Sequence, residues 1–206
     1  MDVIFINGMP GTGKTTMAEI LVALSPIVRG GQEFNFEHMS IGNTLRAMAI
    51  GREILEDEKE LSRSIQPYAD LIMEAKPIPH SLVFDIVSYR LITQPRDRSL
   101  IIDGFPRFIE QIAGLEKIIQ NAGITNVVQF VMQADNDVVK DRIISRGTRP
   151  GEKHINENFL DFRLSEYQIN VSPALNKLAE LDMVITHRID ASSTKEESLK
   201  QILTSL

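Results

Sequence analysis

The chain alternates short, continuous apolar segments with longer stretches in which apolar residues recur at helical spacing. The apolar segments are residues 3–6, 34–39, 100–102, 126–132 and 183–189. A run of this kind is typical of a strand buried on both faces, as in a parallel sheet. The intervening stretches are long enough for helices, which cover such a sheet on both sides. The pattern predicts an α/β fold with a five-stranded parallel sheet and helices on both faces.

Apolar stripes and end signals mark the predicted helices. Residues 15–24 follow the first strand in a helical pattern. Two further stripes are formed by Ile109, Ile112, Leu115 and Ile119, and by Val138, Val139, Ile143 and Ile144. Each stripe predicts a helix with one buried face, and Gly123 stands where the first of them would end. Ser193 and Glu196 have capping-box spacing, which predicts a last helix up to Leu206.

Two regions fit the alternation less well. Residues 41–80 carry helical patterns but no strand, and their acidic residues fit a solvated helix face. Residues 147–157 are polar and rich in turn formers, which predicts a loop between two helices. Because no repeat, low-complexity tract or linker is visible, residues 1–206 are expected to form a single domain with these two insertions.

Composition narrows the class of protein. The chain has 206 residues, of which 43% are apolar and 24% charged, which is ordinary for a globular protein. It has no cysteine, so disulfides and thiolate zinc sites are excluded. The net charge of −6 argues against nucleic acid as a partner. No apolar run approaches 18 residues, so no membrane association is expected. A soluble, cytoplasmic protein is the expectation.

The strongest single motif is glycine-rich and follows the first predicted strand. Residues 8–15 match G-x-x-x-x-G-K-S/T in full, with a strand before and a helix after. The glycines let backbone N–H groups approach phosphate oxygens, and the helix N-terminus adds positive potential. Lys14 can reach the β- and γ-phosphates of a nucleotide, and Thr15 can offer its hydroxyl to Mg²⁺. The motif predicts nucleotide binding, and a chance glycine-rich turn is a poor alternative in this context.

A carboxylate follows the predicted strand at residues 100–102. Proteins with this phosphate loop often hold Mg²⁺ through an acid at the end of a buried strand, and Asp103 occupies that position. Taken alone, Asp103 could equally cap the next turn.

The segment that starts at Asp103 carries a resemblance to a known family. Residues 103–107 read Asp-Gly-Phe-Pro-Arg, and Gln111 follows four residues after the arginine. This resembles the adenylate kinase family of nucleoside monophosphate kinases, which carries D-G-F/Y-P-R and a glutamine at this spacing. Further matches cover nearly the whole chain, at residues 8–15, 40–46, 76–78 and 189–191 and at Arg142, Arg146 and Arg163.

The resemblance implies a P-loop NTPase fold with two functional insertions. Residues 40–80 would form a helical monophosphate-binding insertion, and residues 147–157 a short lid. Closing both would exclude water from the reacting phosphates. The partners implied are ATP and a nucleoside monophosphate, with AMP favoured because Gln111 suits the edge of adenine, and the enzyme would be a monomer.

The resemblance also implies a role for each matching residue. The ATP site would comprise Gly8, Pro10, Gly11, Thr12, Gly13, Lys14, Thr15, Thr16 and Arg142. The monophosphate site would comprise Ser40, Ile41, Arg46, Lys76, Ile78, Gly104, Arg107 and Gln111. Lys14, Arg107, Arg146 and Arg163 would act on the phosphoryl in transfer, and Thr15 and Asp103 would hold the Mg²⁺ that accompanies ATP. Permanent planar cations suit this chemistry, since phosphoryl transfer depends on positioning and charge neutralisation.

Three departures from the family pattern keep alternatives open. Ile41 stands where adenylate kinases carry threonine and UMP/CMP kinases usually carry alanine, and Asn43 replaces an aspartate. In the lid, Glu152 and the pair 154–155 align with the family's arginine and two aspartates, and Arg149 or Lys153 could substitute for the cation. A UMP/CMP kinase, or another small-molecule kinase of this fold, is therefore the alternative, and a non-catalytic nucleotide-binding regulator ranks lower.

Overall fold

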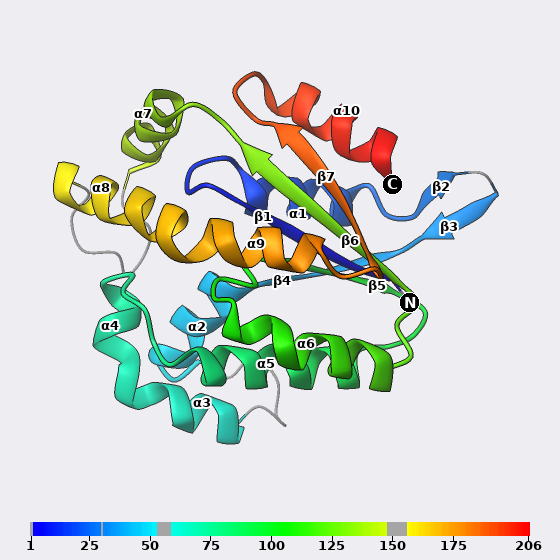
Figure 1. The fold of residues 1–206 in the computed structure, drawn as a ribbon, viewed down its shortest axis with the longest axis horizontal. Helices are drawn as coiled ribbons and strands as arrows, with labels where there is room; N and C mark the ends of the chain where they lie inside the picture. Colours follow the sequence, from blue (N-terminus) through cyan, green and yellow to red (C-terminus); the bar gives the residue numbers. More distant parts are fainter. Residues whose placement is uncertain (1, 30, 53–58, 148–155) are drawn as a thin grey trace.

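A five-stranded parallel sheet forms the centre of the protein (Figure 1). The computed structural model describes residues 2–29, 31–52, 59–147 and 156–206. The strands, in spatial order, are β4 (Phe36–Ser40), β5 (Ser99–Asp103), β1 (Asp2–Gly8), β6 (Asn126–Gln133) and β7 (Val184–Asp190). Every neighbouring pair is parallel. The predicted five-stranded parallel sheet, and its position along the chain, are confirmed.

Helices connect the strands and cover the sheet on both faces (Figure 1). The α-helices are α1 (Lys14–Ala23), α2 (Ile41–Ala49), α3 (Lys59–Ile65), α4 (Ala69–Met73), α5 (His80–Thr93), α6 (Glu110–Asn121), α7 (Asn136–Arg146), α8 (Glu157–Glu166), α9 (Ser172–Ala179) and α10 (Lys195–Ser205). A 3₁₀ turn, η2 (Gln66–Tyr68), precedes α4, and a π-helical turn, η3 (Tyr167–Val171), joins α8 to α9.

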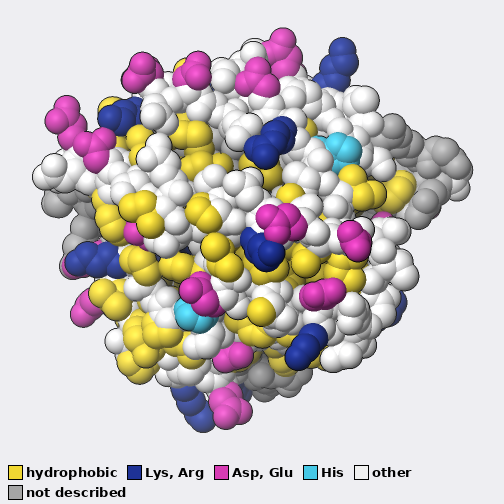
Figure 2. Space-filling model, in the orientation of Figure 1, with side chains coloured by type: hydrophobic (Ala, Val, Ile, Leu, Met, Phe, Trp, Pro, Cys, Tyr) yellow, Lys and Arg dark blue, Asp and Glu magenta, His cyan; other side chains and the backbone are white. Residues whose placement is uncertain are grey.

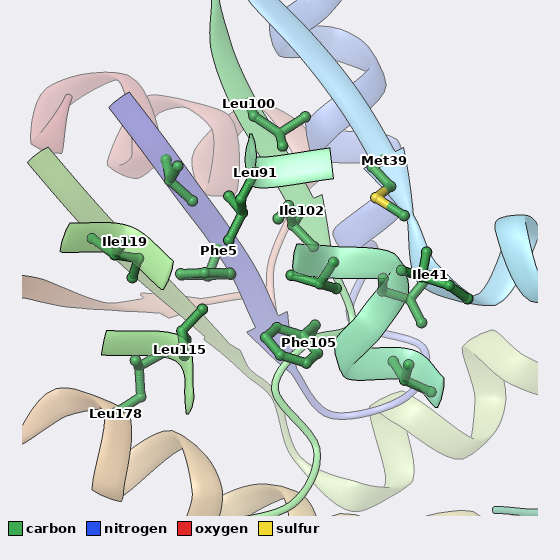
Figure 3. Packing of buried hydrophobic residues seen from close by; sticks show 14 of the residues in the cluster. Phe5, Met39, Ile41, Leu91, Leu100, Ile102, Phe105, Leu115, Ile119 and Leu178 are labelled. Atoms are coloured by element: carbon green, nitrogen blue, oxygen red, sulfur yellow. The ribbon is translucent and has the colours of Figure 1, made fainter. Parts of the chain in front are cut away.

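Residues of strand β1 are apolar on both sides because both of its faces are buried. Val3 and Phe5 belong to the cluster that packs under α5, α6 and α9, whereas Ile4 and Ile6 belong to the cluster that packs under α1 and α10. The side-chain period of two in a strand produces this division. Figure 3 shows the first cluster, in which the rings of Phe5 and Phe105 lie with their centroids 6.1 Å apart.

The register of the sheet brings the ends of β1, β4 and β5 level with one another. Ile6 pairs with Asp103, and Ser40 pairs with Asp103 on its other side. Because all strands are parallel, the loops after their carboxyl ends meet at one edge, where doubly wound folds bind ligands. The segments 8–13, 41–46 and 104–107 therefore gather there, although they are far apart in sequence.

The predicted strand at residues 34–39 is divided in the structure. Phe34 ends β3 (Gln32–Phe34), which forms an antiparallel hairpin with β2 (Ile27–Arg29), and β4 begins at Phe36. Between them, the backbone carbonyl of Asn35 accepts a hydrogen bond from the N–H of Ser99 at 2.8 Å. The apolar run thus covers the end of one strand and most of another, and the hairpin was not predicted.

Three details of the predicted helices also need correction. Ile109 and Ile144 are about half exposed, because each lies away from the buried stripe of α6 or α7. The last helix begins one residue later than predicted: Thr194, not Ser193, is the N-cap, and its side chain accepts from the N–H of Glu197. Its capping box therefore uses Glu197 rather than Glu196. Gly123 follows α6 with a positive φ of 63°, as predicted for a helix end.

The surface in Figure 2 shows acidic and basic side chains interspersed over one face of the molecule. No helix among the described residues combines the length and hydrophobicity that crossing a membrane requires.

Candidate active site

A large cleft opens at the carboxyl edge of the sheet. Its volume is about 750 Å³. The segments that line it are the phosphate loop, the start of α2, residues 75–78, residues 103–108, the end of α7, α8 with η3, and residues 191–198. The structure thus brings together most of the residues predicted for the site from segments spread over nearly the whole chain.

The phosphate loop is shaped by glycines that have no room for, or no tolerance of, a side chain. Gly8 has φ +135°, and a Cβ on it would lie 2.0 Å from the backbone oxygen of Met132. Gly13 has φ +87° and forms the N-cap of α1. Lys14 opens this helix, and its Nζ donates to the carbonyls of Gly8 at 3.0 Å and Met9 at 2.6 Å. The loop therefore curls around its own lysine at the positive end of α1, a geometry that binds phosphate.

Asp103 is almost entirely buried at the end of β5, beside the loop. Its Oδ2 lies 2.9 Å from Nε2 of His38. Burial works to raise the pKa of Asp103, but the hydrogen bond and charge of His38, the charge of Lys14 and a hydrogen bond with Thr15 outweigh it and hold the pKa below its ordinary value. A carboxylate ionised in this way, next to a threonine hydroxyl, is the oxygen donor set that Mg²⁺ with bound phosphates and waters requires.

Basic side chains dominate the wall of the cleft, although the chain as a whole is acidic. They are Lys14, Arg46, Lys76, Arg107, Arg142, Arg146, Arg163 and Lys195, against Asp103, Asp141 and Glu166. Such a concentration of one sign of charge in a concave site attracts and holds anions. The cleft is therefore built for a ligand with several negative charges.

The turn after β5 aims Arg107 into the cleft. Gly104 has φ +83°, and Arg107 Nε donates to its carbonyl at 3.0 Å. A Cβ on Gly104 would stand 3.3 Å from Arg107 Nη2, so the guanidinium lies over the glycine. Gln111 stabilises this turn, because its Oε1 accepts hydrogen bonds from the N–H of Arg107 at 2.8 Å and from the N–H of Phe108 at 3.2 Å.

The other arginines come from three helices. Arg46 of α2 donates to Oδ1 of Asn43 at 2.6 Å, so the amide that stands in place of the family's aspartate orients it. Arg142 donates to the carbonyls of residues 191–193, at 2.7 Å for Ser193, which ties α7 to the loop after β7. Arg163 of α8 lies over the ring of Phe159, with Cζ 5.8 Å from the ring centroid.

Two of the predicted site residues do not line the cleft. Ile41 is 2% exposed and packs in the hydrophobic cluster of Figure 3, beside Met39. Gln111 is also 2% exposed, and its Nε2 donates to the carbonyl of His80 at 3.3 Å. The other predicted site residues line the cleft, among them Ser40, Lys76, Ile78 and Arg146.

The lid residues named above, at positions 149 and 152–155, lie outside the described part of the chain. The described segment on its first side ends with Gly147, after α7. On its second side Asn156 caps α8, and its side chain accepts from the N–H of Phe159 at 2.9 Å.

Sequence reasoning missed several residues of the site. Asn7, Tyr167 and Asn170 line the cleft, and His38 contacts Asp103. Tyr167 and Asn170 belong to η3, whose π-helical turn is invisible in the spacing of apolar residues, although such turns often occur at functional sites. Burial raises the pKa of the Tyr167 phenol, with Arg188 opposing it, so the phenol stays neutral at pH 7. Asn7 left a visible signal, as the polar end of an otherwise apolar strand.

Comparison with known proteins agrees with this geometry. The family model described as "Adenylate kinase" matches residues 6–183, which includes the loop, Asp103, Arg107 and all three arginines of α7 and α8. The chain belongs to the adenylate kinase family. It is accordingly a phosphotransferase of the nucleoside monophosphate kinase group, and the resemblance read from the motifs is confirmed.

Curated relatives match along most of their length. "Adenylate kinase 1" of Nostoc sp. is 28% identical over 199 residues, covering 97% of this chain and 95% of that protein. "Adenylate kinase" of Phocaeicola vulgatus is 28% identical over 173 residues, covering 84% and 82%. "Adenylate kinase" of Kocuria rhizophila is 25% identical over 206 residues, covering 100% and 99%. The similarity therefore extends along most of the chain and is not confined to the phosphate loop.

Proposed function

We propose that the protein reversibly transfers the γ-phosphoryl of Mg-ATP to AMP, giving two ADP. The observation that carries this proposal is that one cleft is lined by the phosphate loop with Lys14, by Arg46 and Arg107, and by Arg146 and Arg163. Two polyanionic substrates need such a surplus of cations to approach each other. The curated relatives described above are named adenylate kinases, which supports the choice of AMP as acceptor.

The acceptor phosphate needs no general base. A nucleoside monophosphate already presents an anionic oxygen at neutral pH, so attack on the γ-phosphorus needs alignment and charge neutralisation instead. In the proposed arrangement, Lys14 and the loop amides hold the donor phosphates. Arg46 and Arg107 hold the acceptor phosphate, and Arg146 and Arg163 neutralise the charge on the group in transfer.

Magnesium fits the donor half of the cleft. Thr15 and the ionised Asp103 would hold it, with waters completing its shell. When bound, Mg²⁺ neutralises and orients the phosphate chain of ATP. His38 keeps the Asp103 carboxylate in place through its hydrogen bond.

The two insertions complete the proposal. Residues 40–80 would bind the monophosphate, and residues 147–157 would close over ATP, so that water is kept from the γ-phosphate. Arg142 would lie against the donor base, since it is fixed by the loop at residues 191–193, which also lines the cleft. We further propose a cytoplasmic monomer, which size-exclusion chromatography with light scattering would test for its monomeric part.

A pyrimidine acceptor is the second candidate. The observation that favours it is the state of the two residues expected to read adenine, because Ile41 is packed in the core and the Gln111 amide is engaged with backbone groups. A small pyrimidine could be read by other groups, such as the backbone at Lys76 and Ile78. A non-catalytic regulator ranks below both, because Lys14, Arg107, Arg146 and Arg163 all line the cleft.

Initial rates of transfer from Mg-ATP to AMP, CMP, UMP, GMP and dTMP test the proposal. We expect AMP to give the highest kcat/KM. A preference for CMP or UMP would replace it with the second candidate. If ATP binds but no acceptor is phosphorylated at micromolar enzyme, the regulator remains.

A further inference from the structure

The side chain of Asn7 lines the cleft but has no part in the phosphoryl transfer proposed above. Asn7 is the penultimate residue of β1, is 1% exposed, and ends a strand whose residues 3–6 are all apolar. Its Nδ2 is buried and makes no hydrogen bond to any described residue. Leaving a buried amide donor without a partner costs about 1–3 kcal/mol. Buried donors are nearly always satisfied in folded proteins, so this one calls for an explanation.

The position of Asn7 indicates what could satisfy it. Side chains alternate along β1, so Asn7 shares the face of Phe5, which packs on Phe105. On the neighbouring strand, the N–H of Gly104 donates to the carbonyl of Ile6 at 3.3 Å, which sets Asn7 level with Gly104. Gly104 has no side chain, and the guanidinium of Arg107 lies over it. Asn7 therefore faces the side of the cleft from which the acceptor phosphate is held.

The next residues of the chain belong to the donor side. Gly8 and Met9 directly follow Asn7, and their carbonyls accept hydrogen bonds from Lys14 Nζ. Asn7 thus occupies the junction between the loop that binds ATP phosphates and the turn that carries Arg107, and it lines the cleft there. In the proposed arrangement, the phosphoryl group crosses this junction as it passes from donor to acceptor.

A second buried amide shows that burial alone does not explain Asn7. Gln129 of β6 is fully buried in the core and does not line the cleft. Its Nε2 donates to the carbonyl of Leu175 at 3.2 Å and to Oγ1 of Thr186 at 3.1 Å. The donor of Gln129 is thus satisfied within the fold, although its Oε1 has no partner among the described residues. The donor of Asn7 has no such partner, and Asn7 lines the cleft.

We propose that Asn7 is a further catalytic residue, whose Nδ2 donates a hydrogen bond to an oxygen of the phosphoryl group in transfer. The inference rests on the proposed function. A neutral donor stabilises charge on the equatorial oxygens without adding another cation to a site already rich in arginine. The hydrogen bond from Asn7 would also hold the phosphoryl group in line between the two nucleotides. The side chains of lysine and arginine hold it less precisely, because they are more mobile.

The test compares Asn7→Leu with wild type, and Gln129→Leu serves as the control. Leucine keeps the shape of asparagine and removes the donor. We expect kcat with the best acceptor to fall about 10- to 100-fold, the range for a hydrogen bond to a charged group. The affinity for Mg-ATP alone should change less than about threefold, and the melting temperature of the free protein should hold or rise, because an unsatisfied donor is lost. Gln129→Leu should lower the melting temperature and leave kcat nearly unchanged.

If Asn7 had only a structural role, Asn7→Leu would lower the melting temperature and leave kcat within about twofold of wild type. That result would overturn the inference. If Asn7→Leu does not fold, a measurement on the wild-type protein still tests the inference. The ¹⁵N-labelled side-chain amide of Asn7 should shift when a dinucleotide with two adenosines joined by five phosphates is added. An amide signal unmoved at saturation would overturn the inference. Failure of the proposed function would show instead as wild-type protein that transfers no phosphoryl to any acceptor.

Discussion

The donor half and the acceptor half of the cleft are built in different ways. The phosphate-binding part of the donor half comes from one continuous segment, residues 8–16. Its backbone N–H groups and a helix N-terminus suit phosphate whatever side chains the variable positions carry. The proposed acceptor half is assembled from Arg46 and Arg107, which follow β4 and β5, and from Lys76, which lies between α4 and α5. The register of β4, β5 and β1 brings the segments of Arg46 and Arg107 to the same edge of the sheet. Phosphate binding is therefore encoded locally, whereas recognition of the acceptor depends on tertiary packing.

Removing the charge at the centre of the donor half should have the largest effect. We expect Lys14→Met to lower kcat roughly 10³-fold, because the developing charge on the transferred phosphoryl would lose a cation of the phosphate loop. Steady-state kinetics with saturating AMP would measure this. Lys177→Met is the matched control, since Lys177 of α9 forms an exposed ion pair with Glu180 at the end of that helix. A Lys14→Met enzyme within tenfold of wild type would contradict the donor-side account.

Removing the arginine at the turn after β5 should affect the acceptor half selectively. We expect Arg107→Ala to lower kcat/KM for AMP about 10²- to 10³-fold, with the Kd for Mg-ATP nearly unchanged. Calorimetric titration with Mg-ATP, alongside kinetics, separates the two. The reverse outcome, in which ATP binding weakens and the KM for AMP is unaffected, would place Arg107 on the donor side instead.

The role of Gln111 can be divided between its two ends. Its Oε1 accepts from the N–H of Arg107 and Phe108, and its Nε2 donates to His80. In Gln111→Glu the acceptor oxygens remain for the turn, but the donor is lost. If Gln111 reads adenine, kcat/KM for AMP should fall about tenfold relative to UMP, the usual cost of one base-reading hydrogen bond. An unchanged ratio of AMP to UMP rates would show that Gln111 only supports the Arg107 turn.

The smallest expected effect lies outside the cleft, in the strand that leads to it. Burial works to raise the pKa of Glu37, but hydrogen bonds from Gln94 and Arg90, with the charges of Arg90 and Arg98, lower it below its ordinary value. The stability that Glu37 contributes is then present above about pH 4.5 and is lost as the pH falls through the lowered pKa.

Urea unfolding of Glu37→Gln measures this contribution. Because the pair is partly exposed, we expect a loss of about 0.5 kcal/mol at pH 7. The difference from wild type should shrink toward pH 3. A difference that grows in acid would mean that the pKa of Glu37 is raised in the folded protein. Glu180→Gln, in an exposed surface pair, provides the control and should change stability little at either pH.

The contrast between the two halves also explains what could be predicted from the sequence. The sheet and the phosphate loop rest on local signals, continuous apolar runs and glycines at fixed spacing, and both are present as predicted. Arg46, Arg107, Arg146 and Arg163 were placed by motif resemblance, and the structure brings them to one cleft. The burial of Ile41 could not be foreseen, because it depends on how α2 packs against the sheet.

Two further features escaped prediction for similar reasons. The hairpin of β2 and β3 has strands of only three residues, too short to show an alternating pattern. The π-helical turn at Tyr167–Val171 leaves no mark in the spacing of apolar residues. Asn7 was visible as a polar residue at the end of an apolar strand, but its meaning required the structure to show that its donor has no partner among the described residues.

The central claim is that this cleft transfers a phosphoryl group between two adenine nucleotides. The most direct measurement uses a single nucleotide: the protein is incubated with Mg²⁺ and ADP alone, and the products are separated by ion-exchange chromatography. The account predicts that ATP and AMP appear in equal amounts until equilibrium is reached, and that Lys14→Met largely abolishes both. If ADP stays unchanged while the same preparation binds Mg-ATP, the proposed adenylate kinase activity is contradicted.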